Sequence, residues 1–232
     1  MALNIQTFKT RTLTAIIFAV VMLVGLLWNG WSFIILFTII HFGCWYEFVK
    51  LMKKIRPKDY GYFLSLGIIY ITFPVLMMLD FGLPFFDSEY NSGLLQIVKY
   101  YSYLFPCAII FSIWINDTMA YIVGSFIGKT PFSKISPKKT WEGTIGGAIL
   151  CVVVIALVSW LLKLDVKVFA TIALLCAVFG TLGDLLESKL KRMANVKDSG
   201  TIMPGHGGFL DRFDSLLIAT PFVWLYFQFF IR

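Results

Sequence analysis

Acidic side chains near the C-terminus have the spacing of a metal–phosphate site. Asp184 and Glu187 lie three residues apart, and so do Asp211 and Asp214. On a helix this spacing places both members of a pair on one face. Three lysines and one arginine lie between the two pairs: Lys189, Lys191, Arg192 and Lys197. Mg²⁺ binds through one or two carboxylates together with substrate phosphates, and basic groups neutralise the remaining charge, so this arrangement predicts a magnesium–phosphate site.

A glycine-rich turn separates the two acidic pairs. It runs from Pro204 to Gly208, contains His206, and follows Lys197 and Asp198. Glycines allow the backbone to come close to a ligand. His206 is open to three interpretations: a proton donor, a ligand contact or a loop histidine.

A second polar cluster covers Ser133–Gly143. Its adjacent lysines, Lys138 and Lys139, are flanked by hydroxyl side chains and precede a predicted helix. Lysines and free N–H groups at a helix start are suited to hold a polyphosphate. A basic loop resting on anionic headgroups explains the same residues, and composition alone favours that interpretation.

The remaining polar cluster begins at Asn116. At helical spacing its stripe comprises Asp117, Tyr121, Gly124 and Gly128. Gly124-x-x-x-Gly128 has the spacing of closely packed membrane helices, and so has Gly143-x-x-x-Gly147. A carboxylate at membrane depth is costly, which predicts a function for Asp117; a structural pair with a lysine is the alternative.

Composition indicates that these clusters belong to a membrane protein. Of the 232 residues 59% are hydrophobic and only 14% charged, whereas an average soluble domain has about 25% charged residues. The 23 Phe, 10 Tyr and 7 Trp suit a lipid-facing surface with aromatic belts. The chain is therefore predicted to be an all-α polytopic integral membrane protein, and its net charge of +7 indicates basic cytoplasmic loops and no nucleic-acid partner.

About seven stretches are apolar enough to cross a bilayer, which needs roughly 20 residues. They are Leu13–Trp28, Trp31–Val49, Tyr62–Leu79, Lys99–Gly128, Thr144–Leu162, Val166–Gly183 and Phe213–Ile231. The first two are predicted to form a hairpin across Asn29 and Gly30.

The four cysteines lie in apolar runs without a C-x-x-C pair and are interpreted as buried small hydrophobes. His41 is interpreted as a packed residue at a helix interface.

Loop charges predict the topology. With the N-terminus in the cytoplasm, the lysine-rich segments 50–60, 129–139 and 189–212 lie inside, and the acidic segment 80–95 lies outside. All three polar clusters then share the cytoplasmic interface, where we expect the active site. Residues 1–100 are predicted to be scaffold helices that also provide lipid access or dimer contacts, and residues 101–232 the catalytic transmembrane region.

The polar motifs together resemble the signature of the phosphatidate cytidylyltransferases (CDP-diacylglycerol synthases). The C-terminal run is Ser188-x-Leu190-Lys191-Arg192-x-x-x-x-Lys197-Asp198-x-Gly200-x-x-x-Pro204-Gly205-His206-Gly207-Gly208-x-x-Asp211-Arg212-x-Asp214. Upstream, Asn116-Asp117-x-x-Ala120-Tyr121 and Ser136-Pro137-Lys138-Lys139-Thr140-Trp141-Glu142-Gly143 resemble other motifs of that family, in the same order. The resemblance covers residues 105–232, whereas the N-terminal part matches only as hydrophobic helices.

This resemblance implies transfer of the cytidylyl group of CTP to phosphatidate, giving CDP-diacylglycerol and pyrophosphate in phospholipid biosynthesis. It implies Mg²⁺ held by Asp184 and Asp211, with a monovalent cation such as K⁺ as a candidate companion. The catalytic residues would be Asp184, Asp211, Lys191 and Arg192. The substrate-binding residues would be Asp117, Ser136, Lys138, Lys139, Lys197, Asp198, His206, Gly207, Gly208, Arg212 and Asp214. A homodimer in a bacterial inner membrane, with CTP, phosphatidate and membrane lipid as partners, is also implied.

Two other functions are open at this point. A CTP-dependent polyprenol or dolichol kinase would share a membrane-embedded nucleotide site but transfer the γ-phosphate. An ion-coupled transporter would use acids within the membrane as an ion path. It would, however, place them near the midplane of interrupted helices, whereas these acids cluster at one face beside a basic loop.

Overall fold

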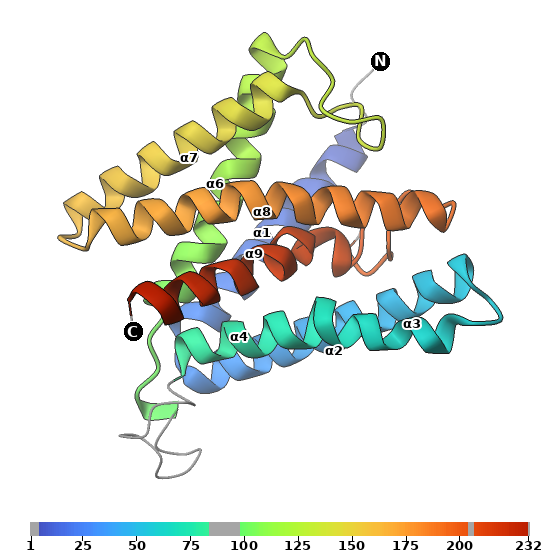
Figure 1. The fold of residues 1–232 in the computed structure, drawn as a ribbon, viewed down its shortest axis with the longest axis horizontal. Coiled ribbons are helices and arrows are strands. Elements are labelled where there is room, and N and C mark those ends of the chain that lie inside the picture. Colours follow the sequence, from blue (N-terminus) through green and yellow to red (C-terminus); the bar gives the residue numbers. More distant parts are fainter. Residues whose placement is uncertain (1–4, 84–97, 204–206, 232) are drawn as a thin grey trace. The chain divides into compact units, whose positions relative to one another are not determined.

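The structure is a computed structural model that describes residues 5–83, 98–203 and 207–231. Across these residues the chain is almost entirely helical, which confirms the predicted all-α class (Figure 1). The elements are α1 (Ile5–Leu27), α2 (Gly30–Ile55), α3 (Tyr60–Gly67), the π-helical turn η1 (Ile68–Thr72), α4 (Phe73–Gly82), α6 (Leu104–Ile127), α7 (Trp141–Leu161), α8 (Val166–Met193) and α9 (Leu210–Phe230).

The helices have the length and apolarity of membrane spans. Six continuous helical stretches of the described chain qualify: Gly30–Ile55, Tyr60–Gly82, Leu104–Ile127, Trp141–Leu161, Val166–Met193 and Leu210–Phe230. A shorter apolar helix, Thr12–Leu27, lies where the first span is predicted. The described part of the chain therefore has six or seven helices able to span a membrane, in agreement with the predicted polytopic membrane protein. The fourth predicted span, Lys99–Gly128, corresponds to α6, which starts five residues later at Leu104 after the non-helical segment 101–103.

The chain divides into two compact units, each made of two sequence segments. Unit 1 combines Met1–Tyr103 with Leu190–Phe213, and unit 2 combines Leu104–Lys189 with Asp214–Arg232. The turn between α8 and α9, which carries the glycine-rich motif, thus belongs to the same unit as the N-terminal helices. The predicted functional division at residue 100 remains a prediction.

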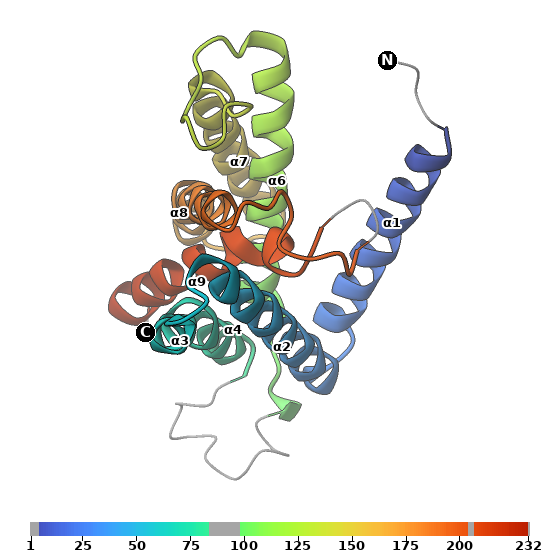
Figure 2. The same ribbon diagram turned by 90° about the vertical axis from the view of Figure 1, so that its right-hand side faces the viewer.

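In unit 1, α1 and α2 form the predicted hairpin. The side chain of Asn29 accepts the N–H of Ser32 at 2.9 Å, and the Ser32 hydroxyl accepts the N–H of Asn29 at 3.1 Å. This capping box satisfies N–H groups that would otherwise lack partners at the start of α2. From there α2 runs beside α3 and α4 (Figures 1 and 2).

A π turn interrupts the helix that packs against α2. It ends just before Phe73, and the next residue, Pro74, has no N–H to donate to a regular helical bond. Within this turn the Thr72 hydroxyl accepts the indole N–H of Trp45 at 3.0 Å and lies 3.0 Å from His41 Nε2. His41 is therefore a packed helix-interface residue, as predicted.

In unit 2, glycines bring α6 and α7 together. A Cβ at Gly143 would lie 2.9 Å from Gly124 Cα, and one at Gly147 would lie 2.6 Å from the Ala120 backbone nitrogen. The two helices lie side by side in both views (Figures 1 and 2). This confirms the interpretation of the two G-x-x-x-G patterns as packing motifs.

All four cysteines are buried and free: Cys44, Cys107, Cys151 and Cys176. They fill apolar positions on membrane-spanning helices, as predicted. None forms a disulfide.

Candidate active site

In unit 1, the last turn of α8 is joined to the first turn of α9 by an ion pair. The Lys191 ammonium lies 2.6 Å from Asp211 Oδ1, and the two side chains are 16% and 4% exposed. A charge pair this well shielded from water is screened weakly by salt. One predicted metal carboxylate is thus held by a predicted catalytic lysine.

The other oxygen of Asp211 organises the turn between these helices. Asp211 Oδ2 accepts the Ser199 N–H at 2.9 Å, the Ser199 hydroxyl at 2.9 Å and the Gly208 N–H at 2.8 Å. Gly207 adopts a left-handed backbone conformation with φ of 83°, which costs little only for glycine. A Cβ at Gly207 would also collide with the Asp211 carboxylate. Ser199, Gly207 and Gly208 therefore lie closely against this aspartate.

Glu47 of α2 anchors the same turn from the N-terminal half of the chain. Its side chain is 1% exposed, and its Oε2 accepts the Ser199 hydroxyl at 2.7 Å and the Leu210 N–H at 2.9 Å. Ser199 thus bridges Glu47 and Asp211. The signal for Glu47 was present in the sequence, because it is an acid inside the otherwise apolar run Trp31–Val49, and such acids are usually functional.

Two motif glycines make room for Glu47. A Cβ on Gly200 or on Gly208 would collide with its carboxylate oxygens. Backbone therefore meets the carboxylate directly on both sides. This close approach gives Gly200 and Gly208 a structural role in addition to any contact that Gly208 makes with substrate.

In unit 2, the other predicted metal carboxylate has a similar partner. Asp184 on α8 forms an ion pair with Lys139, and the two side chains are 30% and 28% exposed. The Ser188 hydroxyl donates to Asp184 Oδ1 at 3.2 Å. A predicted metal carboxylate and a predicted phosphate-binding lysine are again in direct contact.

Two more predicted aspartates belong to this cluster in unit 2. Asp214 interacts electrostatically with Asp184, Asp117 and Lys139. Its helix approaches α8 closely at Gly183, where a Cβ would collide with the Asp214 carbonyl oxygen. Asp214, Asp184, Asp117 and Lys139 therefore form one electrostatically coupled group within unit 2.

The loop before α7 is closed by its own hydrogen bonds. The Thr140 hydroxyl accepts the Gly143 N–H at 3.1 Å, and the Glu142 carboxylate accepts the N–H groups of Lys129 and Thr130 at 3.1–3.2 Å. Capping by Thr140 occupies one of the N–H groups predicted to hold phosphate. Lys139, which lies just before α7, connects this loop to Asp184 through their ion pair.

Most of the other predicted site residues have side chains exposed at the surface. Exposed side chains are those of Lys138, Arg192, Lys197, Asp198 and Arg212, and Ser136 is half-buried. His206 lies outside the described residues. The roles of these residues in substrate binding remain predictions.

Taken singly, each predicted metal carboxylate is a suitable donor for a magnesium ion that also binds phosphate oxygens. Asp184 and Asp211 each offer carboxylate oxygens, which are the hard ligands that Mg²⁺ prefers. Among the described residues no group of three or more His, Cys, Asp or Glu side chains is arranged to hold a metal ion by itself. A site completed by substrate phosphates is consistent with this, because Mg²⁺ commonly uses only one or two protein carboxylates there.

Comparison with known proteins matches the C-terminal part of the chain. The sequence model described as "Cytidylyltransferase family" matches residues 98–230. A phosphatidate cytidylyltransferase of Bacillus subtilis is 44% identical over 126 residues, which is 53% of this chain and 46% of that protein. The chloroplastic phosphatidate cytidylyltransferase 4 of Arabidopsis thaliana is 44% identical over 115 residues, 49% of this chain and 29% of that protein.

A phosphatidate cytidylyltransferase of Staphylococcus haemolyticus is 40% identical over 143 residues, which is 60% of this chain and 52% of that protein. The matched region of this chain thus spans about half the length or less of these relatives. Glu47 lies outside the residues matched by the family model.

Proposed function

The chain belongs to the cytidylyltransferase family, and we propose that it transfers the cytidylyl group of CTP to phosphatidate, producing CDP-diacylglycerol and pyrophosphate. The observation that carries this proposal is the pairing of acids and lysines at the motif positions. Asp184 contacts Lys139, and Asp211 contacts Lys191. This pairing suits a reaction between two polyanions, because the lysines would neutralise phosphate charge and the carboxylates would bind a metal ion that does the same.

The reaction needs charge neutralisation more than it needs proton transfer. Near neutral pH the phosphate monoester of phosphatidate carries about −1.5 to −2 charge, since its second pKa is about 6. Its oxygen attacks the α-phosphorus of CTP, the bond from that phosphorus to the bridging oxygen breaks, and pyrophosphate leaves with the bond electrons. No strong general base is required.

The residues of this chain would position the substrates and reduce their mutual repulsion. Lys139 and Lys191 would transfer their contacts from carboxylate to phosphate oxygens as the substrates bind. Arg192 and Lys138 lie beside them in sequence and would add positive charge for the leaving pyrophosphate. Mg²⁺ held by Asp184 and Asp211, with a monovalent cation such as K⁺ as a candidate companion, would supply further charge neutralisation at the phosphates.

The proposed location is the cytoplasmic interface of a bacterial inner membrane. The acyl chains of phosphatidate stay in lipid, whereas CTP arrives from the cytoplasm. Basic loops at 50–60, 129–139 and 189–212 favour that side. We also propose a homodimer; the G-x-x-x-G glycines pack α6 against α7 within one chain and so do not carry this part of the proposal.

Labelled CTP tests the reaction. Purified protein in micelles containing phosphatidate and Mg²⁺ should release pyrophosphate and form a lipid that carries cytidine. A CTP-dependent lipid kinase would instead release CDP and leave no cytidine on the lipid. Ion flux through reconstituted vesicles without CTP would favour the transporter. A panel of CTP, UTP, ATP and GTP then measures selectivity for the base.

A further inference from the structure

A basic pocket lies in unit 1 between the C-terminal end of α2 and the segment 196–201. Its volume is about 310 Å³, the lower end of the range for small-molecule sites. Its polar lining consists of Lys50, Lys54, Lys197, Asp198, Ser199 and Thr201. Three lysines against one aspartate leave an excess positive charge, which suits a phosphate group.

The wall of this pocket is fixed by the network around Asp211. Ser199 is 4% exposed; its hydroxyl donates to Glu47 and its N–H donates to Asp211. Glu47 stands three residues before Lys50 on α2, so the same helix that anchors the turn also presents lysine to the pocket. The pocket therefore borders the turn that holds a predicted metal carboxylate.

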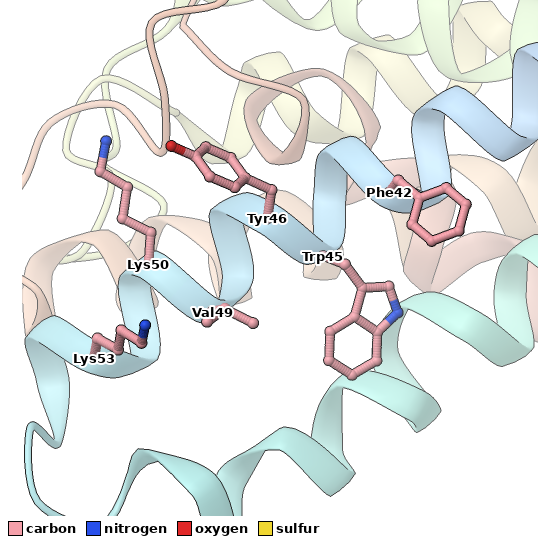
Figure 3. Close-up of a pocket in the computed structure, with 6 residues that line it drawn as sticks. All are labelled: Phe42, Trp45, Tyr46, Val49, Lys50 and Lys53. Atoms are coloured by element: carbon pink, nitrogen blue, oxygen red, sulfur yellow. The ribbon is translucent and has the colours of Figure 1, made fainter.

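An apolar groove of about 570 Å³ adjoins the pocket along α2 (Figure 3). It is lined by Phe42, Trp45, Tyr46 and Val49 and ends at Lys50 and Lys53. Lys50 lines both hollows. Figure 3 shows Tyr46 and Lys50 projecting from the same side of α2, with Trp45 on another. An apolar surface that ends in ammonium groups matches a lipid with a phosphate headgroup.

We propose that α2 forms the phosphatidate site, with the lipid phosphate in the pocket at Lys50, Lys54 and Lys197 and an acyl chain along the groove from Val49 to Phe42. This proposal rests on the proposed function and deepens it. It places the lipid substrate on a helix outside the residues matched by the family model. The phosphate would lie beside the Ser199–Asp211 contact, close to the chemistry assigned to that turn.

Lys54→Ala tests the pocket, and Lys58→Ala is its matched control. Lys54 lines the pocket, whereas Lys58 is exposed in the loop after α2 and lines neither hollow. Both variants remove one positive charge from the same end of α2. Lys54→Ala should raise the KM for phosphatidate by about five-fold, from the loss of one lysine–phosphate attraction, with the KM for CTP unchanged. Lys58→Ala should leave both constants unchanged.

A binding measurement keeps this test independent of turnover. Micelles with dioleoyl phosphatidate should raise the thermal unfolding temperature of the wild-type protein more than micelles of phosphatidylcholine alone, and Lys54→Ala should lose most of that difference. Val49→Trp, which fills the groove, should weaken binding of dioleoyl phosphatidate more than that of the short-chain dihexanoyl lipid. If binding follows this pattern and no cytidine is transferred, the lipid site stands and the proposed reaction fails.

Three outcomes would overturn the lipid site. Equal effects of Lys54→Ala and Lys58→Ala would mean that only general surface charge matters. A raised KM for CTP without a change for phosphatidate would assign the pocket to the nucleotide. Unchanged binding of dioleoyl phosphatidate by Val49→Trp would remove the groove from the proposal.

Discussion

Lys139 and Lys191 occupy the carboxylates that a metal ion would need. A lysine ammonium next to Asp184 or Asp211 provides the positive charge that Mg²⁺ would otherwise supply. In the proposed reaction, Asp184 and Asp211 would hold the metal ion, and Lys139 and Lys191 would pass to phosphate oxygens. Each carboxylate and each lysine would then keep a partner of opposite charge.

Asp184→Asn tests the metal assignment at the residue level. The amide keeps the shape of the side chain but removes its charge, so we expect turnover to fall by about a hundred-fold or more while the protein remains folded. Rates measured against Mg²⁺ concentration, with circular dichroism as a check of folding, give the answer. Asp59→Asn is the control, because Asp59 is exposed in the loop before α3. Near-normal turnover of Asp184→Asn at limiting Mg²⁺ would refute the assignment.

Glu47→Ala should release the turn between α8 and α9. The Leu210 N–H would lose its buried acceptor, which costs about 1–3 kcal/mol, and Ser199 would lose one of its two carboxylate contacts. We expect faster tryptic cleavage after Lys197 and lower turnover. Glu47→Gln retains an acceptor oxygen and should behave more like the wild type.

The cleavage site separates local release of this turn from general unfolding. Cleavage after Lys58 in the loop before α3 should be unchanged in Glu47→Ala. Equal acceleration at both sites would indicate global destabilisation, and unchanged cleavage after Lys197 would show that Glu47 does not hold the turn.

Gly208→Ala should destabilise the same turn from the other side of the contact. The new methyl group would collide with the Glu47 carboxylate, and overpacking of this kind costs about 1–3 kcal/mol. Glu47→Asp withdraws the carboxylate by one methylene and should partly rescue Gly208→Ala. A double-mutant cycle of thermal stability in detergent measures this coupling, and strictly additive effects would mean that the two residues do not interact.

At the level of helices, apolar runs in the sequence predicted the membrane-spanning segments. They did not predict the hydrogen bond between Glu47 on α2 and Ser199 in the turn after α8. The span from Val166 was expected to end at Gly183, yet α8 continues to Met193 and so includes Asp184 and Lys191. Spanning helices can be predicted from local composition because crossing the bilayer requires about 20 mostly apolar residues in a row. The Glu47–Ser199 bond joins residues 152 positions apart, and such pairing depends on tertiary packing that a single sequence does not encode locally.

Gly147→Ala tests the packing of α6 against α7. In a free helix this change would stabilise by about 0.5–1 kcal/mol. Here the methyl group meets the Ala120 backbone at 2.6 Å, so we expect a loss of about 1–3 kcal/mol instead. Gly61→Ala is the control, because nothing lies within 4 Å of its added Cβ. Thermal unfolding in detergent distinguishes the two, and stabilisation of Gly147→Ala would contradict the packing.

For the whole molecule, the orientation in the membrane is a prediction that chemical labelling decides. With the N-terminus in the cytoplasm, Lys58 lies in the predicted cytoplasmic segment 50–60. Lys163 lies between the fifth and sixth predicted spans, which places it outside, and each of the two lysines is replaced singly by cysteine. The four native cysteines are buried and should give a low background. A membrane-impermeant maleimide should label Lys58→Cys in inverted vesicles and Lys163→Cys in right-side-out vesicles. The opposite pattern would invert the topology.

The anchoring of the motif turn by Glu47 limits how freely the two halves of such a protein can be recombined. The family model begins at residue 98, yet the turn that carries its densest motif is fastened to residue 47. A chimera that joins residues 98–232 to foreign N-terminal helices would have to bring its own acceptor for Ser199 and Leu210. Without such an acceptor, the transplanted turn would keep every residue of the motif but lose the two hydrogen bonds that fix its conformation.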